Sequence, residues 1–240
     1  MKIEIKGLDA LSAKLDRIGK KTLLLATNAA IKDTAFQIRD GLQREMSVAF
    51  DRPTPWAIDT VRVDVSKKLR AVIGMTSNRK NDSDSWHTPY FANPNIHGGS
   101  RPFKKEERIL RAAGILPQGM FIVPAKDAWL NQYGNVPGQE IQQVLKSVGA
   151  LGQTSMIITR KGNKRSAAQN RYFVMKRAGR PIGIGERLGP GNSRMLFIFI
   201  SSPVYRPRFN FHQVGSQVFF QNWKKNFKAR WKEYQSYNIK

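Results

Sequence analysis

The sequence predicts an α+β fold, in which an antiparallel sheet is flanked by a long N-terminal helix and a C-terminal helix and carries a basic insertion. Three patterns of apolar residues predict it. Apolar residues recur at helical spacing near both ends of the chain, alternate with polar residues over 61–65, and form a continuous run over 195–200. These patterns are typical of amphipathic helices, a half-buried strand and a fully buried strand. The chain has 240 residues, and we expect one domain over 1–240 with an insertion at 115–191.

Two helices are expected at the start of the chain. Four apolar residues are spaced as on one helix face: Leu8, Leu11, Leu15 and Ile18. Gly19 is expected to end this first helix, because glycine lowers helix stability. A longer helix is expected from Thr22 to about Ser47, since its apolar residues keep one face and basic residues lie on the others.

The middle of the chain is expected to alternate short strands, helices and loops. The strands 61–65 and 69–75 are expected to pair as a hairpin around Ser66, Lys67 and Lys68. The further elements expected in this part are a loop at 77–85, a helix at 104–113, a strand at 120–123, a loop at 129–138 and a helix at 139–148.

The last third of the chain is expected to complete the sheet and to end in a helix. Residues 149–191 are rich in glycine and basic residues, and their apolar patches, 156–158 and 172–175, are expected to form strands that extend the sheet. The continuous apolar run 195–200 predicts the central buried strand. A final helix is expected from Asn210, as its N-cap, to about Tyr234.

The charge of the chain predicts an acidic partner. Forty-one Lys and Arg residues stand against 17 Asp and Glu, which gives a formal net charge of +24. A positive field of this size favours nucleic acid, an anionic membrane or an acidic protein surface. The chain has no cysteine, which excludes disulfides, thiolate metal sites and cysteine nucleophiles.

No catalytic, cofactor-binding or metal site is expected. The histidines His87, His97 and His212 are widely separated and lack the spacing of metal ligands. The glycine-rich segment 182–186 lacks the remaining residues of a dinucleotide or phosphate loop, so we expect a tight turn beside a strand there. The sequence therefore predicts a protein that is not an enzyme and needs no cofactor.

Paired carboxylates are the remaining candidates for catalytic chemistry. Glu106 with Glu107, and Asp82 with Asp84, lie close together in the sequence. On so basic a chain they are expected to be surface charges, the first pair near a helix N-terminus where the helix dipole favours negative charge. A nuclease would need a clustered acidic metal site, and the sequence does not indicate one.

No membrane partner is expected. The first residues alternate charged and apolar side chains and lack the apolar stretch of an export signal. The longest apolar run, 195–200, is far shorter than the roughly 20 residues that cross a bilayer.

A group of basic residues forms the first candidate contact surface. Its members are Arg160, Lys161, Lys164, Arg165, Arg171, Lys176, Arg177 and Arg180. One interpretation is a solvated basic loop. The other is contact with DNA phosphates or with an acidic neighbouring protein, because lysine and arginine gain affinity for a polyanion through counterion release. No base-reading motif accompanies them, so contact with DNA would be independent of sequence.

Aromatic residues alternate with basic ones near the C-terminus, over 219–231. One interpretation is a platform on which single-stranded bases stack. We favour the other, in which the aromatic rings, which lie near helical spacing, pack on the sheet or on a neighbouring subunit while the lysines and arginines face outward.

Several short segments resemble the neck and tail-completion proteins of tailed bacteriophages, the minor tail protein Z-like family. The segments are Ile5–Leu11, Ala29–Ala30, Ile96–Arg101, Asn131–Ile141, Arg180–Ile184 and Tyr205–Phe209. In the third of them, His97 stands where relatives often carry an acidic residue, and Gly99 where they carry threonine. The resemblance extends over most of the chain and involves no catalytic motif.

The resemblance implies a structural virion protein that joins head and tail. It implies a six- or twelve-fold ring of identical subunits, contact with adjoining connector, portal or tail-tube proteins, and possible lining of the DNA path. Location in the virion neck or tail, after assembly in the host cytoplasm, would follow. The subunit-interface candidates are Lys67, Lys68, Asp82, Trp129, Tyr133, Trp223, Phe227 and Trp231. The alternative function is a sequence-independent nucleic-acid-binding protein.

Overall fold

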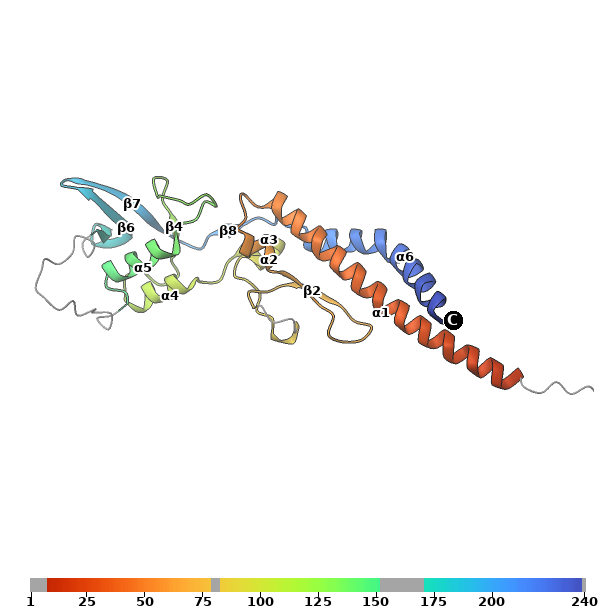
Figure 1. The fold of residues 1–240 in the computed structure, drawn as a ribbon. Coiled ribbons are helices and arrows are strands. Elements are labelled where there is room, and N and C mark those ends of the chain that lie inside the picture. The colour runs from red at the N-terminus through yellow and green to blue at the C-terminus, as the bar shows by residue number, and fades with distance from the viewer. Residues whose placement is uncertain (1–7, 79–82, 152–170, 239–240) are drawn as a thin grey trace, which may run out of the picture. The chain divides into compact units, whose positions relative to one another are not determined.

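The computed structural model describes residues 8–78, 83–151 and 171–238, which form two compact units (Figure 1). Unit 1 comprises Met1–Pro89 with Arg208–Lys240, and unit 2 comprises Tyr90–Pro207. The sequence analysis expects one domain with an insertion at 115–191. The second unit is longer than that insertion, and Leu110 of the helix at 105–112 belongs to the same hydrophobic core as the sheet. The α+β class is confirmed.

Two long helices build unit 1. Helix α1 (Leu8–Ala49) and helix α6 (Phe211–Asn238) lie side by side and run in opposite directions (Figure 1). Helix α1 is continuous, so the expected end at Gly19 is wrong. A glycine in a helix interior costs only about 1 kcal/mol, and the surrounding residues keep the helical hydrogen bonds.

Smaller elements pack around α1 in the same unit. They are helix α2 (Pro55–Asp59), strands β1 (Val61–Asp64) and β2 (Val72–Met75), and the short 3-10 helix η1 (Ser83–Ser85). The antiparallel hairpin of β1 and β2 confirms the prediction from alternating residues. Buried Asp64 accepts hydrogen bonds from the backbone N–H groups of Ser66 and Ser83, at 2.9 and 3.0 Å. Hydrogen bonds from the side chain and backbone of Ser66, and then those from Ser83, lower the pKa of Asp64. The two backbone hydrogen bonds hold the hairpin loop and η1 together.

Unit 2 is built on a four-stranded antiparallel sheet in the order β4-β7-β6-β5. Its elements are α3 (Ala92–His97), β3 (Gly99–Ser100), α4 (Lys105–Ala112), β4 (Phe121–Pro124), α5 (Gly138–Ser147), β5 (Tyr172–Arg177), β6 (Arg180–Gly189), β7 (Asn192–Ile200) and β8 (Val204–Tyr205). The apolar run 195–200 is an inner strand, as predicted, and the patch 172–175 extends the sheet. The patch 156–158 lies outside the described residues.

The expected tight turn at 182–186 is wrong, because this segment lies within strand β6. Its glycines serve the sheet instead. A Cβ atom added to Gly183 would lie 2.3 Å from the backbone oxygen of Phe197 on the neighbouring strand. Only glycine therefore allows β6 and β7 to approach as they do.

The hydrophobic core of unit 2 lies between the sheet and helices α4 and α5. Its most buried side chains are Leu110, Val144, Leu145, Ile184 and Leu196. Burying a side chain of this size contributes about 1.5–3 kcal/mol. The predicted apolar faces of the helices 104–113 and 139–148 thus form the core that holds the unit together.

A buried ion pair joins helix α4 to Arg101, the residue that follows strand β3. The guanidinium of Arg101 donates two hydrogen bonds to the carboxylate of Glu107, at 2.8 and 2.6 Å, and both side chains are almost fully buried. The backbone N–H groups of Lys104 and Ile122 donate to the same carboxylate, at 2.7 and 2.9 Å. The expectation that Glu107 is a surface charge is wrong, because this N-terminal turn of the helix faces the protein interior.

Burial by itself would raise the pKa of Glu107, but the hydrogen bonds from Arg101, Ile122 and Lys104 outweigh it and lower the pKa. The carboxylate is therefore ionised at neutral pH, and its four hydrogen bonds compensate for the loss of water.

We predict that Glu107→Gln destabilises unit 2 by about 3–5 kcal/mol at neutral pH, because it leaves Arg101 buried without a counter-charge. The pKa of Glu107 is lowered from its usual 4.5 in the folded protein. The stability difference between wild type and the variant is therefore full above pH 4.5 and decreases as the pH falls through the lowered pKa. Urea unfolding of both proteins from pH 7 to pH 3 measures this difference. Glu106→Gln, the control, should cost less than about 1 kcal/mol, and an equal loss in both variants would contradict the prediction.

We also predict that Gly183→Ala destabilises the sheet by about 3 kcal/mol, because the new methyl group meets a backbone oxygen that cannot move without breaking the strand pair. Gly189→Ala is the matched control in the same strand, since nothing lies within 4 Å of the added Cβ. Thermal unfolding followed by circular dichroism compares the two variants. Similar melting temperatures would show that the close approach of β6 and β7 is unimportant.

Candidate interaction surfaces

A groove in unit 1 is bordered by helix α1, the β1–β2 hairpin and helix α6. Its volume is about 360 Å³. The lining residues are Ile31, Thr34, Ala35, Ile38, Leu69, Arg70, Ala71, Ile73, Phe219 and Trp223. Most of them are apolar and none is acidic, so the groove offers an apolar surface without negative charge.

Four aromatic rings form a stripe along α6. Phe219, Trp223, Phe227 and Trp231 are spaced four residues apart, and consecutive ring centroids lie 5.8, 6.0 and 6.2 Å apart. The rings lie against one another, and Phe219 and Trp223 also line the groove. The stripe belongs to unit 1, and its partly exposed rings leave apolar surface available for another molecule.

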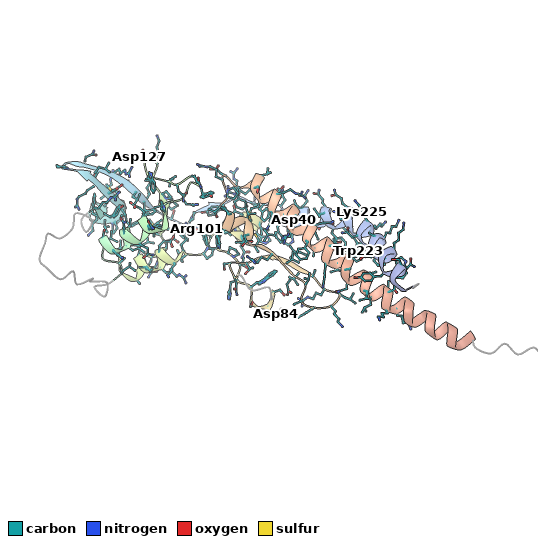
Figure 2. The ribbon with its side chains drawn as sticks, viewed as in Figure 1. Asp40, Asp84, Arg101, Asp127, Trp223 and Lys225 are labelled. Atoms are coloured by element: carbon teal, nitrogen blue, oxygen red, sulfur yellow. The ribbon has the colours of Figure 1, made fainter. Side chains whose placement is uncertain are left out.

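Only some of the predicted interface residues lie near this groove. Lys67 and Lys68 are exposed in the hairpin loop that continues into the lining residues Leu69 and Arg70. Trp223, labelled in Figure 2, lines the groove from α6. Phe227 and Trp231 lie one and two turns further along α6. Lys67 is paired with Asp84, with 3.1 Å between Nζ and Oδ2.

The other interface candidates are elsewhere. Trp129 and Tyr133 belong to a loop of unit 2, in which the side chain of Asn131 accepts hydrogen bonds from the backbone of Tyr133 and Asn135. Trp129 is 57% exposed and is accessible to a partner. Asp82 lies outside the described residues.

The basic candidates meet in part at the tip of the β5–β6 hairpin. Lys176, Arg177 and Arg180 are exposed there, around a turn whose central residues, Ala178 and Gly179, have φ angles of +47° and +78°. Arg177 and Arg180 are direct partners across the two strands. Like charges in this arrangement destabilise a hairpin, and an anion bound between them would remove the repulsion.

Arg171, another of the basic candidates, forms ion pairs within unit 2. Together with Arg194 it pairs with the buried carboxylate of Glu186, to which both arginines donate at 2.7 Å from Nε. Burial would raise the pKa of Glu186, but the hydrogen bonds from the two arginines lower it. Arg171 remains 44% exposed, and its charge is balanced in part by the buried Glu186. The candidates Arg160, Lys161, Lys164 and Arg165 lie outside the described residues.

A second contact fastens the same region to helix α5. The Tyr172 hydroxyl donates to the Glu140 carboxylate, and Arg171 also approaches Glu140 at 3.4 Å. Burial and the negative charge of Glu140 raise the pKa of Tyr172, so the hydroxyl keeps its proton and remains a donor. These polar contacts connect strand β5 to helix α5.

The sequence analysis missed one exposed apolar segment. Leu23, Leu24 and Leu25 of helix α1 are 47%, 46% and 38% exposed, whereas the adjacent Thr22 and Ala26 are 2% and 0% exposed. Three consecutive residues point in three directions around a helix, so α6 cannot cover them all. Three consecutive leucines in a predicted helix could have indicated this exposed apolar surface from the sequence.

Within the described residues, no three His, Cys, Asp or Glu side chains are grouped so as to hold a metal ion. No helix in the described part of the chain is both long and apolar enough to cross a membrane. Comparison of the chain with family models, curated proteins and solved structures gives no match, so the interpretation of these surfaces rests on the chain's own residues.

We predict that replacing Lys176, Arg177 and Arg180 together by glutamine weakens binding of the protein to duplex DNA. The slope of log K against log salt should fall by about 2.7, at about 0.9 for each phosphate that the protein no longer neutralises. Fluorescence anisotropy of a labelled duplex at several salt concentrations measures both quantities. The control replaces the exposed Lys105, Lys126 and Lys146, which removes the same charge from unit 2. Equal losses in both triple variants would show that the hairpin tip is not a DNA-contact site.

Proposed function

We propose that this protein is a structural virion subunit of a tailed bacteriophage, of the neck or tail-completion type, which forms a ring and joins the head to the tail. The resemblance of its short motifs to this family supports the proposal. So does the position of two of these motifs, since Gly99–Ser100 and Val204–Tyr205 pair as β3 and β8 although about a hundred residues separate them in the sequence. The proposed role requires no catalysis and no cofactor.

The observation that carries the proposal is the exposed leucine segment of α1. Leu23, Leu24 and Leu25 present apolar surface in several directions on a helix whose other side is covered by α6. Apolar surface of this kind is stabilised when another subunit covers it. We propose that the contact is made by different surfaces on the two partners, which gives a closed ring when the rotation between neighbouring subunits closes. We propose six or twelve subunits, with adjoining connector, portal or tail-tube proteins as neighbours in the virion.

The basic hairpin of unit 2 suits such a ring, because a protein around a DNA channel contacts phosphates without reading bases. The same observation favours the second candidate function, a sequence-independent nucleic-acid-binding protein. The net charge of +24 and the facing pair Arg177 and Arg180 support that function without requiring assembly.

The test is the absolute mass of nuclease-treated protein in high salt, by light scattering after gel filtration. We predict a discrete species of six or twelve subunits. Replacing Leu23, Leu24 and Leu25 by glutamine, which has a similar helix propensity, should shift it to smaller species without loss of helix content. The control replaces Gln213, Gln217 and Gln221, which are exposed on α6, by alanine.

A monomer at all concentrations, combined with salt-dependent DNA binding, would contradict the ring and favour the second function. A ring that the leucine variant leaves intact would show that the subunit contact lies elsewhere.

A further inference from the structure

The unit 1 groove has the dimensions of a site for one face of a helix. On α1, its lining residues Ile31, Ala35 and Ile38 follow one another at spacings of four and three residues. This row covers about 10 Å at 1.5 Å per residue, or roughly two helical turns. Phe219 and Trp223 form a parallel row on α6. An amphipathic helix bound in such a groove inserts side chains that are three, four and seven residues apart.

Among the described residues, the charges around the groove that have no counter-charge are positive. Arg70 lines it, the exposed Lys68 precedes it in the same loop, and the exposed Lys224 follows Trp223 on α6. In the described part of the chain none of these three residues forms an ion pair. The nearby carboxylate of Asp33, by contrast, is bound by Arg230, with 2.6 Å between its Oδ2 and Nε. The groove therefore combines an apolar floor with unneutralised positive charge at its edge.

The apolar floor and the positive edge indicate which class of molecule fits the groove. DNA would satisfy the positive edge but offers no apolar side chains for the floor. A second copy would have to present an acidic apolar segment, yet the chain carries only 17 acidic residues against 41 basic ones. Several of those acidic residues, such as Asp33, Glu107 and Glu186, are bound to arginines. An acidic amphipathic helix of a different protein matches both the floor and the edge.

We infer that the groove between α1, the β1–β2 hairpin and α6 binds an acidic amphipathic helical segment of a partner protein. Apolar side chains of that segment contact Ile38, Ala71 and Trp223, while its carboxylates pair with Lys68, Arg70 and Lys224. The inference rests on the proposed function, since a joining subunit must hold a neighbour of a different kind. It adds the chemistry by which that neighbour is recognised.

The probe is a fluorescein-labelled synthetic peptide with leucines three, four and seven residues apart and glutamates at most other positions. A scrambled peptide of the same composition has no apolar face. Fluorescence anisotropy at 150 mM salt should show at least about tenfold tighter binding of the amphipathic peptide. Its binding should protect backbone amides of 69–75 and 219–226 from hydrogen exchange.

Charge-reversal variants test the edge of the groove. Lys68→Glu with Arg70→Glu should weaken binding of the amphipathic peptide at least about tenfold, since two attractive contacts become repulsive. Lys225→Glu with Lys232→Glu is the matched control, because both residues are exposed on α6 and the net charge changes equally. Figure 2 marks Lys225 on that helix. The control should lose less than about twofold.

The apolar floor is tested with Trp223→Ala and, in the hairpin, with Ala71→Glu. Both variants should weaken binding of the amphipathic peptide, and the melting temperature of Trp223→Ala is measured alongside to check that the variant is folded.

Equal binding of both peptides, or equal losses in both charge-reversal pairs, would overturn the inference, because simple charge attraction would explain the binding. Amide protection of the groove on raising protein concentration without peptide would also overturn it in favour of a second copy. Loss of the ring in the leucine variant, with peptide binding retained, separates this site from the subunit contact.

Discussion

The close packing of α1 on α6 is the contact on which unit 1 depends. Small or polar residues of α1, among them Ala26, Ala30 and Thr34, are buried and let the second helix approach closely. A Cβ atom on Gly41 would lie 2.9 Å from a methyl group of Val218. Asn226 donates to Thr34 and Gln37 at 2.9 and 2.8 Å, and Arg230 binds Asp33, so polar contacts fix the register of the two helices. The groove exists because this pair of helices stands beside the hairpin.

Unit 2 uses a different means of stabilisation. Two carboxylates, Glu107 and Glu186, are buried among apolar residues, and arginines neutralise both. Breaking such a pair costs much more than forming it contributes, because the remaining charge is left without water. Part of the large basic excess of the chain is therefore structural. The exposed Lys176, Arg177 and Arg180 of the β5–β6 hairpin are among the charges that an external anion can reach.

The exposed surfaces differ in chemistry, and this difference supports a protein that joins other molecules. The leucine segment of α1 is apolar, the groove is apolar with a positive edge, and the hairpin tip of unit 2 is basic. A protein whose only role was to bind nucleic acid would have no need of the first two. A joining subunit requires contacts with copies of itself, with a neighbour of another kind and with the DNA that passes through.

Local sequence patterns were sufficient for most elements. The hairpin of β1 and β2, helices α4 and α5, the inner strand β7 and helix α6 were all predicted, because apolar periodicity depends on neighbours in the sequence. Helix α1 was predicted with a false end at Gly19, because a glycine lowers helix stability by only about 1 kcal/mol and does not always end a helix. Short elements such as α2, α3 and β8 carry too few residues for a periodic pattern and were missed.

The sequence by itself determined the class of the fold, the basic character of the chain and the positions of its long helices and main strands. Only the tertiary structure decided which charges are used inside the protein. Glu107 was taken for a surface charge, yet it is buried and paired with Arg101. Arg171 is exposed, but its guanidinium pairs with the buried carboxylate of Glu186. The groove likewise brings Ile38, Ile73 and Trp223 together from three separate segments. Burial and charge pairing depend on distances in space, and a local pattern of residues does not contain them.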